Sequence, residues 1–356
     1  MQIGTWSDFA RHQLWRVEPG TWQSETVRAA YYAGHEAVRW PLIVLNRLMF
    51  GVLLGSPRLP PEELPRAVRA VRHRYRELQR KDLEHVARGT YPASQLFAAP
   101  LSRYARVAPS FFIDALKVIR RARAGNYADL PAPRPAELPA YYRRCFHWQT
   151  DGYLSDHSAR LYDLGVEILF TGMADAMRRQ VLGELGGLSP NAAILDVGCG
   201  TGRLLQQLRS ARPEARLTGI DLSEAYVRHA RAELGAAASV HTGNAEALPY
   251  ADQSFDAVVS VFVFHELPAR VRRRVFSEMV RVLKPGGVLV LEDAAQLSDS
   301  PDLSAVLRQF PRDLHEPFFE QYLGDPLEDL FSAPLAPPRC QPVFVAKLVS
   351  ARKHAG

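Results

Sequence analysis

A glycine-rich loop is the part of this sequence whose residue types and spacing point most directly to ligand binding. The apolar run Ala193–Val197 leads into the loop Asp196-Val-Gly-Cys-Gly-Thr-Gly202, and a helical pattern follows over residues 202–211. Three glycines at alternate positions allow a tight turn and leave room for a ligand against the main chain. The helix that follows presents free N–H groups and a positive dipole end to that ligand. Asp221 ends the next apolar run, where a doubly wound fold places a carboxylate that accepts hydrogen bonds from ribose hydroxyls.

Two histidine–glutamate pairs contain side chains that could accept a proton. His265 and Glu266 follow the apolar run 255–261, and His315 and Glu316 lie in a segment rich in proline and phenylalanine. A neutral imidazole accepts a proton from a phenol or an enol near pH 7. His265 is therefore the candidate base, Glu266 would orient its ring, and His315 is a second candidate. Alternatively, His265 packs against the next helix and His315 is a surface residue at a helix start. Because the histidines lack H-E-x-x-H or other paired-ligand spacing, we predict no metal site.

Short apolar runs that alternate with helical patterns must position these residues. The clearest strands are 193–197, 217–221, 255–261 and 287–292, helical patterns occupy 202–211, 223–234 and 269–283, and 342–350 is a last strand. Such alternation predicts a parallel sheet covered by helices on both faces. The fold class is therefore α/β, a Rossmann-like doubly wound sheet. In open sheets of this kind ligands bind beyond the carboxyl ends of the strands, which is where the glycine loop, Asp221 and His265 fall.

The first 150 residues have a different pattern, in which prolines interrupt helices. Residues 64–89 place apolar side chains at helical spacing with arginines on the opposite side, and residues 110–124 are a second helical stretch. Four prolines between positions 130 and 139 predict an extended linker. We therefore expect a mainly α-helical accessory domain over residues 1–150 that shapes the substrate site. A second domain over residues 151–356 would begin with helical residues 155–186 and contain the sheet.

Three further motifs stand in order along the second domain. They are Gly243-Asn-Ala-Glu246 after a third strand, Phe255-Asp256 at the start of the fourth, and Leu283-Lys-Pro-Gly-Gly287 before the fifth. The loop itself is G-x-G-x-G with an aspartate two residues before it, and not the G-x-G-x-x-G of dinucleotide oxidoreductases. Over residues 175–350 the sequence resembles the class I S-adenosylmethionine-dependent methyltransferases, in the group that includes the quinone-biosynthesis methyltransferases.

The resemblance implies that S-adenosyl-L-methionine is the cofactor and that ten residues hold it. The residues implied near its methionine part are Asp196, which would organise the loop, the backbone of Gly198, Gly200 and Gly202, and Ser260 and Val261 at the end of the fourth strand. Those implied near its adenosine part are Asp221 for the ribose hydroxyls, Leu222 against the adenine, and Asn244 and Ala245 beside the adenine. Asn244 departs from the aspartate that is more usual in the family, but an amide can still donate or accept a hydrogen bond there.

Aromatic segments on either side of the sheet are candidates for a lid. Segments before the glycine loop commonly fold over the cofactor in this superfamily, so the resemblance implies His147, Tyr153 and Tyr162 as lid residues. After the fifth strand, Phe318 and Tyr322 would suit an apolar substrate. Packing between the two domains is the alternative role for the residues before the loop. The fourth strand is not followed by the Asn/Asp-Pro-Pro-Tyr/Phe tetrapeptide, which argues against methylation of the amino groups of adenine or glutamine.

Composition excludes several classes of protein. The chain has 356 residues, of which 47% are hydrophobic and 23% are charged, as in ordinary globular proteins. Three scattered cysteines argue against a disulfide framework and favour a reducing cytoplasm. We read no signal peptide at the N-terminus. The longest apolar run, residues 40–55, carries Asn46 and Arg47 at its centre and is too short for a spanning helix.

Charge is divided unevenly between the two halves of the chain. Residues 1–150 contain 23 Lys and Arg against 12 Asp and Glu, a net charge of +11, while residues 151–356 carry −5. A basic region can meet nucleic acid or an anionic membrane. The helix over 64–89 shows a solvated arginine face without base-stacking aromatics, so nucleic acid is disfavoured. The run 40–55 is either a buried core helix or a peripheral membrane contact. The sequence carries no signal for the oligomeric state.

These observations together predict a cytoplasmic S-adenosylmethionine-dependent methyltransferase. Its acceptor would be a small aromatic or lipid-like molecule, with O- or C-methylation favoured, because aromatic residues surround the expected site. Two alternatives stay open. One is an RNA methyltransferase that uses the basic N-terminal region, and the other is an interaction protein that keeps the cofactor fold without catalysis.

Overall fold

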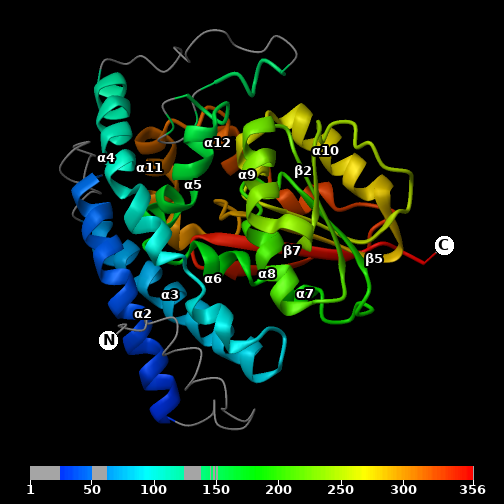
Figure 1. Ribbon diagram of the computed structural model, residues 1–356, viewed down its shortest axis with the longest axis horizontal. Coiled ribbons are helices and arrows are strands. Elements are labelled where there is room, and N and C mark those ends of the chain that lie inside the picture. The colour runs from blue at the N-terminus through cyan, green and yellow to red at the C-terminus, as the bar shows by residue number, and fades with distance from the viewer. Residues whose placement is uncertain are drawn as a thin grey trace.

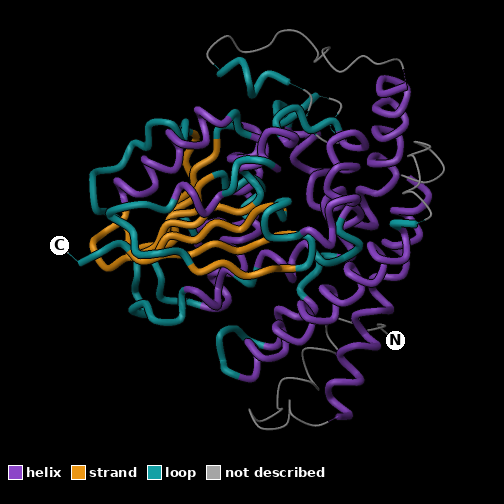
Figure 2. The backbone as a smooth tube through the Cα atoms, turned by 180° about the vertical axis from the view of Figure 1, so that it is seen from behind, coloured by secondary structure: helices purple, strands orange, loops and turns teal. Residues whose placement is uncertain are grey.

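A seven-stranded sheet forms the centre of the molecule in the computed structural model, which describes residues 25–49, 62–123, 138–144, 146, 149 and 151–355. The strand order is β3-β2-β1-β4-β5-β7-β6, and Figure 2 shows the strands side by side with helices around them. The strands are β1 (Ala193–Val197), β2 (Arg216–Asp221), β3 (Ser239–Thr242), β4 (Phe255–Val261), β5 (Leu283–Ala294), β6 (Arg339–Val343) and β7 (Ala346–Arg352). The expected Rossmann-like arrangement is confirmed.

The first five strands run parallel because helices connect them. In the register, Ile194 of β1 lies opposite Leu217 of β2 and Ala257 of β4. Every residue of β1 is buried, as expected for a strand with both faces covered. The connecting helices are α8 (Arg203–Ala211), α9 (Glu224–Leu234) and α10 (Ala269–Val282), and they match the predicted helical stretches to within one residue at each end.

The end of the chain folds differently from the single strand that we expected over residues 342–350. It forms a hairpin in which β6 pairs antiparallel with β7, and β7 pairs antiparallel with β5. The chain reverses at Phe344, whose φ of 56° lies in the left-handed region. A non-glycine residue seldom adopts that conformation, so the sequence showed no turn signal there and the prediction of one strand was wrong.

Helices cover both faces of the sheet. On one face, Ile194, Val259 and Leu348 pack against apolar side chains of α8 and α9. On the other face, Leu195, Val258 and Leu289 pack against α10. This face also meets the C-terminal elements, which are η7 (Pro301–Leu303), α11 (Ser304–Leu314), α12 (Phe319–Leu323) and η8 (Leu327–Leu330), through Tyr322 and Leu327. Because successive side chains of a strand point to opposite faces, the sheet has a hydrophobic core on each face.

The N-terminal region is helical, as predicted, and lies along one side of the molecule (Figure 1). Its elements are α2 (Glu25–Asn46), α3 (Leu64–Ala87), η4 (Ala93–Phe97) and α4 (Leu101–Arg123). The last of these begins nine residues before the expected start, because it continues through Pro109. Within the described residues, none of the helices combines the length and the apolar composition that crossing a bilayer requires.

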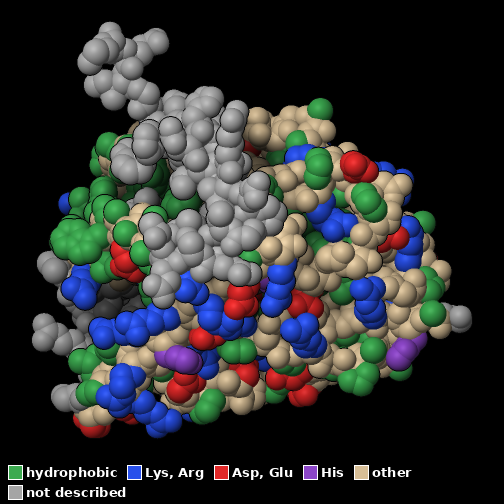
Figure 3. Space-filling model, turned by 90° about the horizontal axis from the view of Figure 1, so that it is seen from below, with side chains coloured by type: hydrophobic (Ala, Val, Ile, Leu, Met, Phe, Trp, Pro, Cys, Tyr) green, Lys and Arg blue, Asp and Glu red, His purple; other side chains and the backbone are tan. Residues whose placement is uncertain are grey.

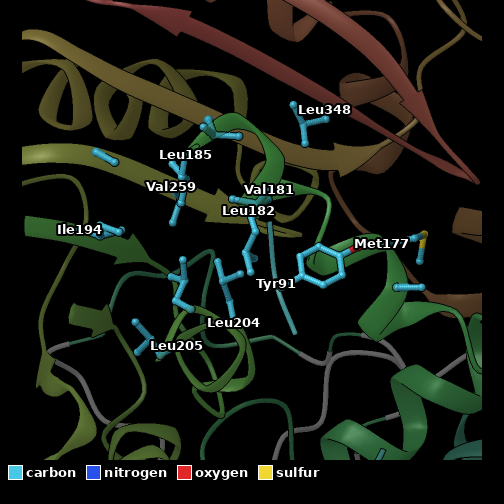
Figure 4. Close-up of a cluster of buried hydrophobic side chains, with 14 of the residues drawn as sticks. Tyr91, Met177, Val181, Leu182, Leu185, Ile194, Leu204, Leu205, Val259 and Leu348 are labelled. Carbon is cyan, nitrogen blue, oxygen red and sulfur yellow. The ribbon is translucent and has the colours of Figure 1, made fainter. Parts of the chain in front are cut away.

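Helices from both sides of position 150 share one hydrophobic cluster. Tyr91 lies in the same cluster as Met177 and Val181, which belong to the segment between the N-terminal helices and β1, and as Ile194 and Leu348 of the sheet (Figure 4). That segment, expected as helical over 155–186, is divided into α5 (Asp156–Leu169), α6 (Ala174–Arg178) and α7 (Val181–Glu184). The N-terminal helices are therefore packed directly against the elements that carry the glycine loop.

Candidate functional site

A pocket lies at the carboxyl ends of β1, β2 and β4, as the doubly wound topology predicts. The glycine loop, the end of β2 and the segment after β4 form its floor, and aromatic residues from before β1 form its wall. Residues of these groups that line it are Gly198, Gly200, Asp221, Leu222, Val261 and Glu266, together with Tyr142, Phe146, Tyr153 and Tyr162. Asn244 and Ala245, which follow β3, and Tyr226 of α9 complete this part of the lining. Seven of the ten residues implied as cofactor ligands are among them.

Backbone geometry explains the glycines of the loop. Gly198, Gly200 and Gly202 have φ values of 74°, 52° and 80°, a region that glycine adopts without a steric penalty. A Cβ atom on Gly198 would lie 2.4 Å from Cγ2 of Val263, and one on Gly202 would lie 2.7 Å from Cδ1 of Leu234. A Cβ on Gly200 would meet nothing within 4 Å. Packing therefore requires the first and third glycines, while the second opens into the pocket.

The Asp221 carboxylate is fixed by main-chain donors at the pocket floor. Its Oδ2 accepts a hydrogen bond from the Gly200 N–H at 2.9 Å, and its Oδ1 accepts one from the Ser223 N–H at 2.8 Å. Burial raises the pKa of Asp221 to about 6, against the lowering effect of these donors. Each carboxylate oxygen has a second lone pair, so the group can also accept hydrogen bonds from a ligand in the pocket.

Leu222, Asn244 and Ala245 line the pocket beside Asp221. The Asn244 Oδ1 atom accepts a hydrogen bond from the Glu246 N–H at 2.9 Å, which holds the side chain in an Asx turn. Its amide nitrogen is the group that could donate to a ligand. Leu222 thus offers an apolar contact and Asn244 an amide at the end of the pocket where the resemblance implies the adenine.

Three of the implied cofactor residues lie outside the lining of the pocket. Gly202 is the N-cap of α8, and Ser260 is buried with its hydroxyl donating to the Val197 carbonyl at 2.8 Å. Asp196 is buried, and its Oδ2 atom has no hydrogen-bond partner among the described residues. Burial raises the pKa of Asp196 to about 7. An orphaned carboxyl beneath the loop suits a site in which a bound ligand supplies the missing donor.

His265 is not among the residues that line the pocket. The side chain is buried, and its Nδ1 lies 2.5 Å from Oδ1 of Asp293 at the end of β5. The ring packs edge-on against Phe319 and Tyr322. Burial lowers the pKa of His265, but the attraction and hydrogen bond of Asp293, together with the nearby Glu316 and Glu266 carboxylates, raise it above its usual value. His265 is thus held by a second residue and is not among those that line the pocket.

Glu266 occupies the position at the pocket that the sequence suggested for His265. Its Oε1 accepts a hydrogen bond from the Tyr153 hydroxyl at 2.6 Å and lies 4.0 Å from Nε2 of His265. Asp293, His265, Glu266 and Tyr153 therefore form a series from the end of β5 to the aromatic wall. Glu266 is the member of the series with a carboxylate at the pocket, and a carboxylate there can accept a proton.

The structure separates the five lid candidates. Tyr153 and Tyr162 line the pocket, with their ring centroids 6.0 Å apart. Phe318 packs against Phe146 with a centroid distance of 6.4 Å, and Tyr322 is fully buried with its hydroxyl donating to the Ala294 carbonyl. His147 lies outside the described residues. The other candidate base, His315, is the C-cap of α11 with a φ of 52°.

Sequence reasoning missed three residues that the fold brings to the site. Tyr142 and Phe146 line the pocket, and the aromatic density of the segment 141–153 was the signal for them. Asp293 directly follows Glu292, where the expected fifth strand ended, so its pairing with His265 had no local signal. Among the described residues, no group of three or more His, Cys, Asp and Glu is placed to hold a metal ion.

Comparisons with known proteins agree with this geometry. A family model described as a methyltransferase domain matches residues 194–287. A demethylmenaquinone methyltransferase from Thermotoga maritima is 36% identical over 138 residues, covering 39% of this chain and 58% of that protein. The O-methyltransferase resE from Aspergillus sclerotiorum is 30% identical over 184 residues, covering 49% and 67%. A solved structure of a SAM-dependent methyltransferase from Aquifex aeolicus is similar at 23% identity, with a TM-score of 0.36 over 49% of this chain and 88% of that chain.

The chain belongs to the class I S-adenosylmethionine-dependent methyltransferases. S-Adenosyl-L-methionine is the cofactor of this family, as the resemblance implied. The chain spans between a fifth and two thirds of the length of the curated relatives that it matches.

Proposed function

We propose that this protein transfers a methyl group from S-adenosylmethionine to a hydroxyl or an acidic carbon of a small aromatic or lipid-like acceptor. The observation that carries the proposal is a single pocket in which Asp221 and the glycine loop lie on one side and Glu266 and tyrosine rings on the other. The names of the matched relatives, which include demethylmenaquinone methyltransferases and O-methyltransferases, support an acceptor of this kind.

The residues of the pocket fit the cofactor in three places. Asp221 would accept hydrogen bonds from the ribose hydroxyls, Leu222 and Asn244 would contact the adenine, and the open space at Gly200 would admit the chain that joins ribose to methionine. The buried Asp196 carboxyl, whose Oδ2 has no hydrogen-bond partner among the described residues, would organise the loop near the methionine part. When bound, the cofactor supplies a methyl group on a sulfonium, and its departure leaves the thioether S-adenosylhomocysteine.

We assign to Glu266 the role of the base that accepts the proton of the methyl acceptor. As the acceptor oxygen or carbon bonds to the methyl carbon, its proton must leave, and the Glu266 carboxylate would take it. Tyr153 donates to that carboxylate and fixes its position. His265, held by Asp293, lies behind Glu266 and acts as a positioning residue rather than as the base. The surrounding tyrosine and phenylalanine rings would exclude water from the reacting atoms.

The arginines of the basic N-terminal region favour a small acceptor over a nucleic acid. Arg74 of α3 pairs with Asp302 at 2.7 Å, and Arg80 pairs with Glu77 at 2.8 Å within the helix. On the face seen in Figure 3, acidic side chains are interspersed among the basic ones. Paired arginines among acidic neighbours do not form the continuous positive groove that tracks a phosphate backbone.

Two variants separate cofactor binding from chemistry. Asp221→Asn removes a charge-assisted acceptor, for which about 1.5–3 kcal/mol is typical, so its affinity for S-adenosylhomocysteine should fall roughly 10- to 100-fold. Glu266→Gln should keep that affinity within a few-fold and lower turnover by about 10² or more, the contribution of a placed base. Calorimetry gives the affinity, and transfer of a labelled methyl group to a panel of phenols, hydroquinones and naphthols gives turnover.

The wild-type result on the panel decides the proposal itself. Labelled product from at least one phenolic acceptor supports it, and a protein that binds S-adenosylhomocysteine but labels none of them contradicts it. His265→Gln should reduce turnover less than Glu266→Gln, because His265 does not line the pocket. A larger effect of His265→Gln would assign the base to the histidine instead.

A further inference from the structure

We propose that a second, smaller pocket holds a hydrocarbon substituent of the methyl acceptor. The pocket lies between α4, α5 and Met49, at the end of the helical segment that begins with α2. The inference rests on the proposed function, because it assigns the part of the acceptor that does not react. It concerns a site formed largely by α5, with residues of α4 and Met49, outside the segment that matches the methyltransferase family model.

The second pocket lies next to the cofactor pocket. Tyr162 lines both the cofactor pocket and the second pocket. Within the cofactor pocket its ring packs edge-on against Tyr153 and Tyr226, with centroid distances of 6.0 and 5.5 Å. The two pockets therefore meet at the Tyr162 side chain. An acceptor whose reacting ring lies near Glu266 could extend a substituent past Tyr162.

The lining of the pocket indicates the chemistry of its occupant. Met49, Phe111, Leu161 and Ile168 supply buried apolar surface. Such walls recognise hydrocarbon through the removal of apolar area from water.

Among the described residues of the lining, Asp114 and Gln149 are polar and have partners within the chain. The Asp114 carboxylate lies 3.6 Å from Nε2 of His157, and Gln149 Oε1 accepts a hydrogen bond from the Ser158 hydroxyl at 2.8 Å. These partners reduce their capacity to select a polar group of the ligand. The lining thus favours a short alkyl group over a sugar, a phosphate or a carboxylate.

Gly165 lets α5 and the Phe111 ring of α4 pack closely at the edge of the pocket. It lies inside α5, where glycine disfavours the helix relative to alanine. A Cβ atom at this position would lie 3.1 Å from Cε2 of Phe111. A side chain here would therefore displace the Phe111 ring, which lines the pocket.

The helices that form the pocket also carry apolar side chains on the outside. Val44 of α2 is 42% exposed, and Ile113 and Leu116 of α4 are 60% and 46% exposed. Leu48, which directly precedes the lining residue Met49, is 42% exposed. Apolar surface both inside and outside this pair of helices favours a hydrophobic acceptor over a polar one.

A series of 4-alkylphenols with chains of zero to eight carbons tests the inference. We expect the affinity of the wild-type protein, measured by calorimetry with S-adenosylhomocysteine present, to rise about threefold per methylene until the pocket is filled. Gly165→Ala and Val166→Phe place new atoms on the pocket side of α5 and should flatten that rise. Both variants should keep the affinities for unsubstituted phenol and for S-adenosylhomocysteine within about twofold of wild type.

Gly34→Ala is the matched control. It is the same substitution inside a helix next to a phenylalanine, with its Cβ 3.4 Å from Cε1 of Phe97, but it lies outside the pocket. It should retain the full dependence on chain length. Thermal unfolding checks that each variant folds, and Gly165→Ala remains informative if Val166→Phe does not, because alanine favours the helix.

The outcomes separate this inference from the proposed function. If wild-type affinity does not rise with chain length, or rises equally in Gly165→Ala and Val166→Phe, the pocket assignment is overturned while methyl transfer to phenols can still stand. If no phenol is methylated but binding depends on chain length in the expected way, the proposed function fails and the hydrocarbon site is supported.

Discussion

Asp221 and Glu266, to which we propose separate roles in cofactor binding and proton transfer, are held in the pocket by different contacts. Asp221 is held by two main-chain donors at the end of β2, whereas Glu266 is held by the Tyr153 hydroxyl after β4. Each carboxylate therefore has its own support. A change to one should leave the geometry of the other intact, which is why the two variants proposed above should affect different measurements.

The raised pKa of Asp221 makes cofactor affinity dependent on pH. Its pKa of about 6 in the free protein means that the carboxyl is mostly protonated at pH 5 and mostly ionised at pH 7. Because ribose hydroxyls donate to the ionised form, binding favours loss of the proton, and affinity should rise with pH. Between pH 5 and pH 7 the affinity for S-adenosylhomocysteine should increase about tenfold and then level off. Calorimetry at several pH values measures this.

Asp221→Asn is the control for that titration, since an amide does not ionise in this range. Its weaker affinity should be nearly independent of pH between 5 and 7. If the variant retained the wild-type slope, the titrating group would be another one, and the buried Asp196, with a pKa of about 7, would be the first to examine.

At the scale of elements, the turn from β1 to α8 depends on contacts with the segment that follows β4. Gly198 can approach Val263 only because it lacks a side chain. The same approach places the loop beside Glu266, so the cofactor side and the acceptor side of the pocket are joined by packing. Packing against Val263 therefore fixes the position of the loop between β1 and α8.

Gly198→Ala should destabilise the protein by more than the backbone strain of a positive φ alone would. The new methyl group would lie 2.4 Å from Val263, and overpacking of this kind costs about 1–3 kcal/mol beyond the backbone penalty. Gly89→Ala is the control, because Gly89 has a similar φ of 70° and its Cβ would meet nothing within 4 Å. Urea unfolding should show the larger loss for Gly198→Ala, together with weaker binding of S-adenosylhomocysteine. Equal losses would mean that backbone strain dominates at both glycines.

At the scale of the whole molecule, a buried ion pair joins the N-terminal helices to the part of the chain before β1. Asp82 of α3 is fully buried and accepts a hydrogen bond from Nε of Arg179 at 2.7 Å. The hydroxyls of Tyr31 and Tyr91 also donate to it, at 3.1 and 2.5 Å. We propose that residues 1–150 form the acceptor side of the enzyme and that this network keeps them in place.

Asp82→Ala should therefore destabilise the entire protein. It leaves the Arg179 charge buried without a partner, which costs about 3–5 kcal/mol. Asp302→Ala breaks another ion pair of α3, that with Arg74, but the Asp302 side chain is 38% exposed. The loss there should be about 0–1 kcal/mol. Chemical unfolding followed by circular dichroism should show one cooperative transition for both variants. A separate early transition in Asp82→Ala would show that the helical region unfolds on its own.

The local pattern of the sequence was sufficient for the parallel sheet and for most of the cofactor side of the pocket. Continuous apolar runs predicted β1 and β4 to the residue, because strands buried on both faces need such runs. The glycines and Asp221 were recognisable because a tight turn and a ribose carboxylate occur at characteristic distances along the chain. These features depend on residues that are near one another in the sequence.

Only the tertiary structure decided which of two adjacent residues lines the pocket. His265 and Glu266 are neighbours, and the chain between β4 and α10 could present either one to the pocket. The aspartate that contacts His265, Asp293, comes from a different strand, 28 residues later. In the same way, the second pocket brings Met49, Phe111 and Gly165 together from three separate helical segments. Contacts between such distant positions leave no periodic signal along the chain, because they arise only when the helices pack against each other.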